Sequence, residues 1–211
     1  MKTAERILLV SLELFNHHGE ANVSSVDIAN ELDISPGNLY YHFKGKEVII
    51  SKLFKMYQQQ MDKILLAPQT ETLTIEDFFY YLLMIFEASH LFRFLYRNPA
   101  EITEKYPQIV KGFRKQLSAK EKVFQQCMKS FHQQGILLGD SQKQQQMVSL
   151  IGLIGTQAPN YNLLLGKDIN DGAYIYQSLS TILFALTPYI NIEKESYIEL
   201  VGMIQQASQK K

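Results

Sequence analysis

The sequence predicts an all-α protein in which an amino-terminal three-helix unit joins a larger helical body, with about nine helices in total. Apolar residues recur at spacings of three and four along almost the whole chain, and no run alternates with the period of two that a strand requires. Proline and glycine fall mainly between these runs, at Pro68, Pro99, Pro107, Gly139 and Gly166, and mark the expected boundaries.

We expect helices at residues 3–18, 25–32, 36–42, 46–66, 74–96, 108–134, 142–166, 171–187 and 194–208, with a short turn near 100–105. The first three helices are short and polar on one side, whereas the helices that follow are longer and more aromatic. This contrast divides the chain into residues 1–48 and residues 49–211, which share the fourth helix.

The length and composition of the chain are those of a folded globular protein. It has 211 residues, of which 46% are hydrophobic and 20% charged. Cys127 is the only cysteine, which excludes an intramolecular disulfide and a cysteine zinc site and favours a buried thiol. No apolar run reaches membrane-spanning length, and the amino terminus lacks a signal-peptide cleavage pattern, so we expect a cytoplasmic protein that does not contact membranes.

Enzyme motifs are absent from the sequence. It contains no glycine-rich phosphate loop, no His-Glu-x-x-His and no nucleophile elbow. The adjacent His17 and His18 do not share a helix face, so they are not expected to bind a metal together. We therefore expect no catalytic residue, no metal and no cofactor.

The first fifty residues carry specific helix start and stop signals. Gly19 is placed to end the first helix in a left-handed turn. Ser24 precedes "SVDIANEL", and Asp27 stands three residues on, as in a capping box. After a short turn, Ser35 can cap the third helix and Pro36 suits its first position. These signals predict a helix-turn-helix.

The third helix has two different faces. Leu39 and Phe43 lie four apart and should pack on the first two helices, while rings and polar groups occupy the other side. The stretch "SSVDIANELDISPGNLYYHFKGKEVI" resembles the DNA-binding region of the TetR family of bacterial transcription regulators, and the resemblance extends over residues 3 to about 55. Asp33 replaces the glycine common in the family; aspartate tolerates a left-handed backbone, but its charge falls near an expected phosphate.

The resemblance implies a set of DNA-binding residues, namely Ser24, Ser25, Val26, Ser35, Pro36, Gly37, Asn38, Tyr40, Tyr41, His42, Lys44 and Lys46. Tyr40, Tyr41, His42 and Lys46 take phosphate roles in this scheme, while the small start of the third helix approaches base edges. Asn38 has the donor and acceptor pattern that suits adenine. The alternative is that the rings are partly buried packing residues.

Charge gives no general sign of nucleic-acid binding. The chain holds 21 basic and 21 acidic residues. Within residues 1–66 there are seven Lys or Arg and eight acids, and the positive charge is concentrated from Lys44 to Lys55. We therefore expect modest non-specific binding to DNA with a shallow salt dependence.

The two central helices of the body, 74–96 and 108–134, are rich in aromatic residues. The default interpretation is that these residues form the hydrophobic core. The more specific interpretation is that the two helices line an effector cavity, whose walls include Phe79, Leu83, Phe86, Phe113 and Leu117. Residues 93–129 hold nine basic residues and three acids, which form a solvated face or receive an anionic head group. A fatty acid or an acyl thioester is the favoured effector.

Helices 142–166 and 171–187 are the expected dimer surface. Gly152 and Gly155 suggest a close approach, and Pro159 should kink the first helix. The expected apolar contacts are Met147, Ile151, Ile154, Tyr176, Leu179, Ile182 and Leu183. The resemblance implies a four-helix bundle across a two-fold axis, and a homodimer that reads a pseudo-palindromic operator in double-stranded DNA.

The functional expectation is a dimeric, ligand-responsive transcriptional regulator. Repression released by a small apolar or amphipathic effector is the favoured sense, with activation as the other. The competing interpretation is a helical small-molecule binding protein that does not touch DNA, because the body alone would have the same sequence pattern.

Overall fold

The computed structural model describes residues 2–66 and 73–209, with side chains as far as Gln205. Within those residues the protein is all-helical, with eleven α-helices, two short 3₁₀ helices and one isolated bridge between Leu137 and Ile190. The predicted fold class is confirmed. None of the described helices combines the length and the apolar character needed to cross a membrane.

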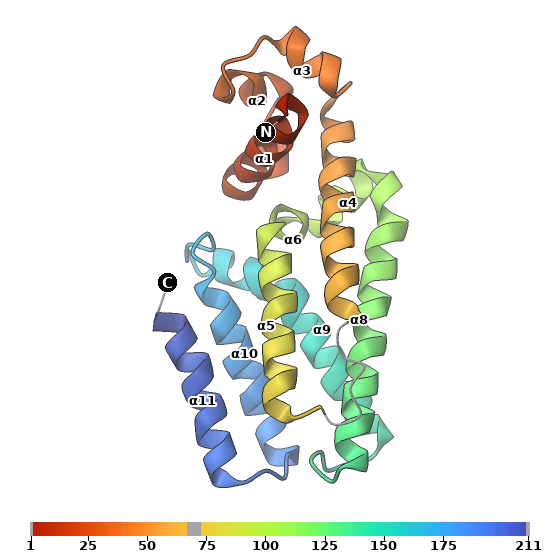
Figure 1. Cartoon of the computed structure of the whole chain (residues 1–211), viewed down its shortest axis with the longest axis vertical. Coiled ribbons are helices and arrows are strands. Elements are labelled where there is room, and N and C mark those ends of the chain that lie inside the picture. Colours follow the sequence, from red (N-terminus) through yellow and green to blue (C-terminus); the bar gives the residue numbers. More distant parts are fainter. Residues whose placement is uncertain (1, 67–72, 210–211) are drawn as a thin grey trace.

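The amino-terminal helices gather at one end of the elongated molecule, at the top of Figure 1. They are α1 (Thr3–His18), η1 (Glu20–Asn22), α2 (Ser25–Glu31) and α3 (Pro36–His42). The next helix, α4 (Lys46–Leu65), starts at this end and runs down into the body.

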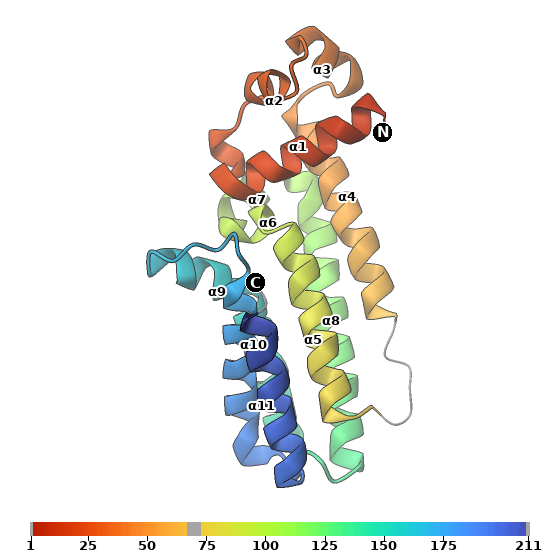
Figure 2. The same cartoon turned by 60° about the vertical axis from the view of Figure 1, so that its left-hand side comes forward.

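The body is built from long helices that run roughly along the molecule (Figures 1 and 2). Its long helices are α5 (Ile75–Leu91), α8 (Pro107–Gln133), α9 (Ser141–Leu164), α10 (Ala173–Leu186) and α11 (Lys194–Gln209). The short helices between them are α6 (Phe94–Arg97), α7 (Pro99–Lys105) and η2 (Thr187–Tyr189). Helix α4 packs on α5 and α8, and α10 packs on α5, α9 and α11.

The predicted start signals are confirmed. The Ser24 hydroxyl accepts from the Asp27 amide at 3.2 Å, and the Asp27 carboxylate accepts from the Ser24 amide at 2.7 Å. The Ser35 hydroxyl accepts from the Asn38 amide at 3.1 Å. These bonds satisfy amides that a helix start leaves without partners and fix both helices of the helix-turn-helix.

Asp33 and Gly19 were both expected in a left-handed backbone conformation, and both have positive φ angles. Asp33 has φ 53° and is the only residue other than glycine with a positive φ in the described part of the chain. The predicted left-handed aspartate is therefore confirmed. Gly19 also has a positive φ, 81°, but its ψ of 145° lies outside the left-handed helical region, because the chain passes directly into η1.

The expected helix 74–96 is broken in the structure. Helix α5 ends at Leu91 and α6 begins at Phe94, and the expected turn at 100–105 forms helix α7. The buried side chain of Asn16, from α1, lies at the break: its amide donates to the Leu91 carbonyl at 2.8 Å, and its oxygen accepts from the Phe94 amide at 3.0 Å. A distant side chain thus satisfies the backbone groups that a continuous helix would have paired.

Candidate functional site

The outer face of α3 is the most exposed ring surface of the amino-terminal unit. Tyr41 is 81% exposed and Tyr40 59% exposed, while Leu39 and Phe43 on the opposite side are buried. The rings of Tyr41 and His42 meet edge to face with centroids 5.2 Å apart. The exposed rings therefore do not serve as packing residues within the protomer.

The remaining residues expected at DNA lie around the same end of the molecule. Ser25 and Lys46 are half-buried. The others are exposed, namely Ser24, Val26, Ser35, Pro36, Gly37, Asn38, His42 and Lys44. The structure thus places α2 and α3 together with small and polar side chains facing solvent at the start of α3.

Lys46 differs from the other expected phosphate contacts. Its ammonium lies 2.6 Å from the Glu20 carboxylate and donates to the backbone carbonyls of Glu20 and Val23 at 2.9 and 2.8 Å. An ammonium has three protons, so these acceptors occupy all of its donors. The expected phosphate role does not fit this geometry, because Lys46 joins η1 to α4 inside the protomer.

The Glu20 carboxylate has further partners from the body. Lys105 lies 3.2 Å away, and the hydroxyl of the buried Tyr106 donates to the same oxygen. Burial acts to raise the pKa of Glu20, but the hydrogen bonds from Lys46 and Tyr106 and the Lys46 charge outweigh it, so the pKa is lowered. Burial and the Glu20 charge raise the pKa of Tyr106. One buried carboxylate thus connects η1, α4 and the α7–α8 corner.

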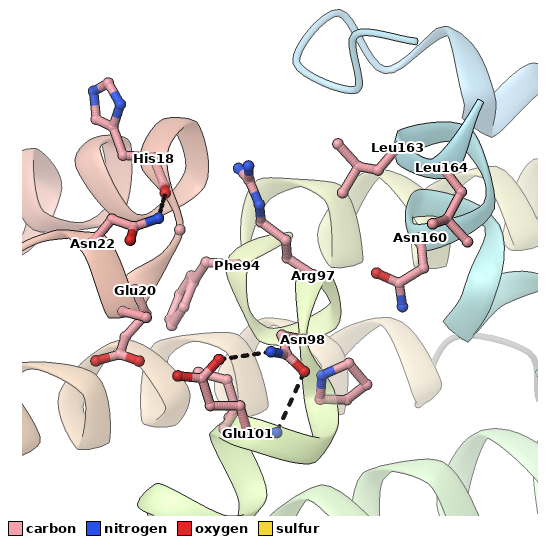
Figure 3. Close-up of a pocket in the computed structure, with 14 residues that line it drawn as sticks. His18, Glu20, Asn22, Phe94, Arg97, Asn98, Glu101, Asn160, Leu163 and Leu164 are labelled. Atoms are coloured by element: carbon pink, nitrogen blue, oxygen red, sulfur yellow. Dashed lines mark hydrogen bonds between the residues drawn. The ribbon is translucent and has the colours of Figure 1, made fainter. Parts of the chain in front are cut away.

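A cavity of about 510 Å³ lies at this same junction (Figure 3). The end of α1 and η1 contribute His18, Glu20 and Asn22, while Arg97 and Leu164 come from α6 and α9. The Arg97 guanidinium donates to the His17 carbonyl at 2.9 Å. This space, lined by both polar and apolar residues, lies between the amino-terminal unit and the end of α9, and it was not expected from the sequence.

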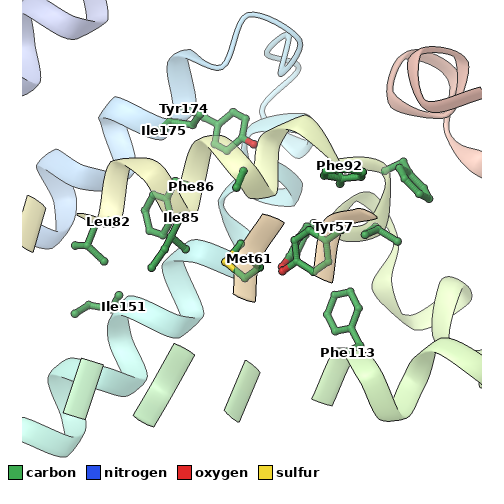
Figure 4. Close-up of a cluster of buried hydrophobic side chains, with 14 of the residues drawn as sticks. Tyr57, Met61, Leu82, Ile85, Phe86, Phe92, Phe113, Ile151, Tyr174 and Ile175 are labelled. Carbon is green, nitrogen blue, oxygen red and sulfur yellow. The ribbon is translucent and has the colours of Figure 1, made fainter. Parts of the chain in front are cut away.

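A second cavity, of about 290 Å³, lies between α5, α8 and α9 in the body. Its apolar walls include Phe86, Leu117, Phe124 and Ile151, and Figure 4 shows Phe86 and Ile151 among the buried side chains. Gly152 also lines it, and a Cβ added at Gly152 would meet no atom within 4 Å. The structure therefore contains an apolar space of ligand size in the expected pair of helices and α9.

The five residues expected to line an effector cavity are thus separated. Phe86 and Leu117 line the 290 Å³ cavity, and Phe113 lines a different hollow beside α7. Phe79 is fully buried in the core, and Leu83 lines neither hollow. Phe79, Leu83 and Phe86 lie on one face of α5, as their helical spacing predicts. The first turns of α5 pack in the core, however, and the cavity begins only at Ile85.

The sequence reasoning missed a polar cluster beside this cavity. The buried Lys120 ammonium donates to the hydroxyls of Tyr57 and Tyr96 at 3.0 and 3.1 Å and to that of Ser89 at 3.4 Å. The two phenols are hydrogen-bonded to each other, and burial, followed by the neighbouring Tyr96, raises the pKa of Tyr57. A signal was present, because Lys120 stands at an apolar position of its helix, between Leu117 and Phe124.

The expected dimer contacts need correction. Six of the seven residues are buried within the protomer, namely Met147, Ile151, Tyr176, Leu179, Ile182 and Leu183, and Ile154 is half-buried. The exposed apolar residues of α9 and α10 are instead Leu153, Tyr161, Leu164, Leu165 and Phe184. Gly155 does allow a close approach, but to the Phe86 ring of the same protomer, which a Cβ would meet at 2.8 Å.

The other reactive side chains fit structural roles. Burial raises the pKa of the Cys127 thiol to about 11, as expected for a buried thiol in a helix. His17 bonds the carbonyl of Glu13, and its ring centroid lies 6.3 Å from that of His18. In the part of the chain described, no group of three or more His, Cys, Asp or Glu side chains could hold a metal ion.

Comparison with known protein families gives two adjoining matches. Residues 7–53 match the model described as "Bacterial regulatory proteins, tetR family", and residues 56–197 match the model described as "Bacterial transcriptional repressor". The two matches meet within α4, the helix that connects the amino-terminal unit with the body.

Individual relatives are similar over different extents. The HTH-type transcriptional regulator AcrR of Shigella flexneri is 29% identical over 70 residues, and the match spans 33% of each chain. A TetR-family transcriptional regulator from Marinobacter aquaeolei VT8 is 28% identical, with a TM-score of 0.82 over 98% of both chains. A SmeT–triclosan complex shares the fold at 15% identity, with a TM-score of 0.59 over 90% of this chain and 93% of SmeT.

Proposed function

The chain belongs to the TetR family of bacterial transcriptional regulators, and we propose that it acts in the cytoplasm as a dimeric repressor released from DNA by a small effector. Members of the family are transcription factors rather than enzymes. The observation that carries the proposal is the exposed ring face of α3, a helix that Ser35 caps and that follows the Ser24-capped α2.

The amino-terminal end of α3 enters the major groove in this proposal. Pro36 and Gly37 have small side chains and allow the backbone to come near base edges, where Asn38 can bond adenine in a bidentate way. Tyr40 and Tyr41 follow on the exposed face of the same short helix and donate to flanking phosphates, which fixes the register.

We divide the chain functionally into a DNA-binding part, residues 1–48, and an effector-binding and dimerisation part, residues 49–211. Helix α4 begins in the first part and packs on α5 and α8 of the second. A movement of α5 or α8 therefore reaches α4, and through it the position of α3.

The dimer forms through residues about 142–187. Leu164 is 87% exposed at the end of α9 and Phe184 is 79% exposed on α10. Together with Leu153 and Tyr161 they leave apolar surface that a second copy can cover, and a groove of about 230 Å³ between α9 and α10 lies beside them. A two-fold dimer of this kind reads a pseudo-palindromic site.

The effector is a small apolar or amphipathic molecule in the 290 Å³ cavity, with a fatty acid or an acyl thioester as the favoured class. A solved structure with a related fold is a complex of SmeT with triclosan. If the effector and DNA prefer different spacings of the two α3 helices, their binding is linked reciprocally, typically by about 1–3 kcal/mol, or roughly 5- to 150-fold in affinity.

A gel shift on the promoter of the protein's own gene tests DNA binding. Tyr41→Ala should abolish the shift and leave the helical content unchanged. Tyr80→Ala is the matched control, because Tyr80 is a similarly exposed tyrosine on α5 in the body. A wild-type protein that moves no fragment would favour the alternative, a small-molecule binding protein without DNA binding.

Native mass spectrometry of freshly purified protein tests the effector half of the proposal. A co-purified small molecule should be found at one per protomer, and adding more of it should weaken the gel shift. An unchanged shift at saturating ligand would contradict release by that molecule, and a strengthened shift would mean that the ligand promotes DNA binding.

A further inference from the structure

The 290 Å³ cavity adjoins a buried positive charge, that of Lys120, which has no carboxylate partner among the described residues. We infer that the effector is a free monocarboxylate of short to medium chain length, whose carboxylate binds the Lys120 ammonium while its chain fills the cavity between α5, α8 and α9. The inference rests on the proposed function for the identity of the cavity as the effector site.

The buried charge of Lys120 favours an anionic ligand. Lys120 is 8% exposed, and among the described residues no carboxylate lies within 4.0 Å of its ammonium. Asp62, whose charge contributes to raising the pKa of Tyr57, accepts a hydrogen bond from Gln116 instead. A buried cation without a counter-charge is costly, by several kcal/mol as an order of magnitude, so an anion at this place gains affinity.

One of the three contacts of the Lys120 ammonium is weak enough for a ligand to replace. The phenol oxygens of Tyr57 and Tyr96 are the two shorter contacts of the ammonium, and the ring centroids, 5.6 and 5.5 Å away, lie behind these oxygens. The Ser89 bond, at 3.4 Å, exceeds the usual range of about 2.7–3.2 Å and is the weakest of the three. Ser89 and Lys120 both line the cavity, so a carboxylate oxygen there can replace the serine as the third acceptor.

The walls and the size of the cavity define the rest of the ligand. Its sides are mainly apolar, and Glu121 is the carboxylate among its lining residues, exposed on the outer side of α8. Its volume of about 290 Å³ is roughly ten times the ~30 Å³ that a water molecule occupies in the liquid, which suits about ten non-hydrogen atoms. A free short fatty acid fits this space, whereas the coenzyme part of an acyl thioester is too large.

Isothermal titration with octanoate and with octanol tests the inference directly. These probes share an apolar chain and differ in the anionic head group. Wild-type protein should bind octanoate at least tenfold more tightly than octanol. Lys120→Met replaces the charged side chain by an unbranched apolar one and should remove the preference for octanoate. Lys122→Met, at an exposed position of the same helix, should keep this preference. Equal affinities in the wild type, or a preference that survives in Lys120→Met, would overturn the inference.

A second variant separates ligand binding from folding. Gly152 faces open space in the cavity wall, so Gly152→Leu fills the chain-binding part without a clash at its Cβ. This variant should unfold at a higher temperature than the wild type and yet bind octanoate at least tenfold more weakly. Unchanged octanoate affinity in a folded Gly152→Leu would place the ligand elsewhere and refute the proposed site.

Gel shifts with the same samples separate this inference from the proposed function. If the wild type shifts its promoter and neither probe binds, the carboxylate site is wrong while the regulator remains. If octanoate binds through Lys120 and no fragment shifts, the regulator is wrong while the carboxylate site remains.

Discussion

The carboxylate of Glu20 lies 2.6 Å from the ammonium of Lys46, and this pair joins the turn after α1 to the start of α4. The side chains are 3% and 15% exposed for Glu20 and Lys46, so solvent screens them little. Lys105 and Tyr106 reach the same carboxylate from the body. Glu20 is therefore one of the side chains that fix the orientation of the helix-turn-helix relative to the body, together with Asn16 and Arg97.

Glu20→Gln should lower the free energy of unfolding by about 1.5–3 kcal/mol, the usual range for hydrogen bonds to a charged group. The amide leaves Lys46 without its counter-charge and cannot accept equally well from Tyr106. Urea unfolding at neutral pH measures the difference. Glu13→Gln, at an exposed position of α1, should change it by no more than about 0.5 kcal/mol. Equal midpoints for the two variants would contradict the proposed role of the carboxylate.

The same carboxylate predicts an acid sensitivity. Burial raises the pKa of Glu20, but the bonds from Lys46, Tyr106 and Lys105 outweigh it, so the folded pKa lies below the ordinary value of 4.5. Its stabilisation is therefore fully present above pH 4.5 and is lost as the pH falls through the lower, folded pKa. The stability gap between wild type and Glu20→Gln should be constant at neutral pH and shrink in acid. A gap independent of pH would show that this carboxyl does not titrate on unfolding.

Substitutions of Asp33 can separate the effect of backbone strain from the effect of the negative charge. Asparagine also tolerates the left-handed backbone, so Asp33→Asn should keep stability while removing a negative charge near DNA. Its affinity for DNA should rise roughly two- to fivefold, since exposed charges contribute up to about 1 kcal/mol. Asp33→Ala should instead lose about 1 kcal/mol of stability, because alanine is strained at positive φ. Fluorescence anisotropy on one DNA fragment measures the affinities, and unchanged values for Asp33→Asn would remove the charge argument.

The balance of charges predicts a weak dependence on salt. Residues 1–66 are not basic overall, and Lys46 is occupied inside the protomer. Binding to random DNA should therefore release counterions from only a few phosphates per monomer, with a shallow slope of log affinity against log salt. Titration at several salt concentrations measures the slope. A slope as steep as that of a strongly basic repressor would show that other cations reach the DNA.

The exposed ring of Phe184 predicts the dimer surface. Phe184→Glu should convert the dimer to monomers, because it places a charge in the exposed apolar surface that α9 and α10 offer to a second copy. Met84→Glu is the control, since Met84 is an exposed apolar residue on α5. Sedimentation velocity at micromolar concentration distinguishes the species. A dimer that persists in Phe184→Glu would place the interface on another surface.

Local signals were sufficient for the helix-turn-helix. Ser24, Ser35 and Pro36 act within one helical turn, so their effect can be read from neighbouring residues. The break after Leu91 depends on Asn16, seventy-five positions earlier in the chain, and spacing within α5 gives no sign of it. The long-range partner of Lys46 was hidden for the same reason.

The faces of the body helices were harder to predict than their existence. Helix α9 carries apolar residues on several sides, with Ile151 buried and Leu153 exposed two positions later. Periodicity therefore could not select the side that faces a second copy. Lys120 was readable as a charge on an apolar face, but only the fold brings Tyr57, Ser89 and Tyr96 to it from two other helices and α6.

Asn16 fixes the corner between α5 and α6. Its side chain holds the last carbonyl of α5 and the first amide of α6 at once, so these backbone ends and α1 move together or the bonds stretch. Phe86 and Ser89, five and two residues before Leu91 on α5, line the cavity. A ligand that pushes α5 along its axis therefore also moves α1, and with it the helix-turn-helix.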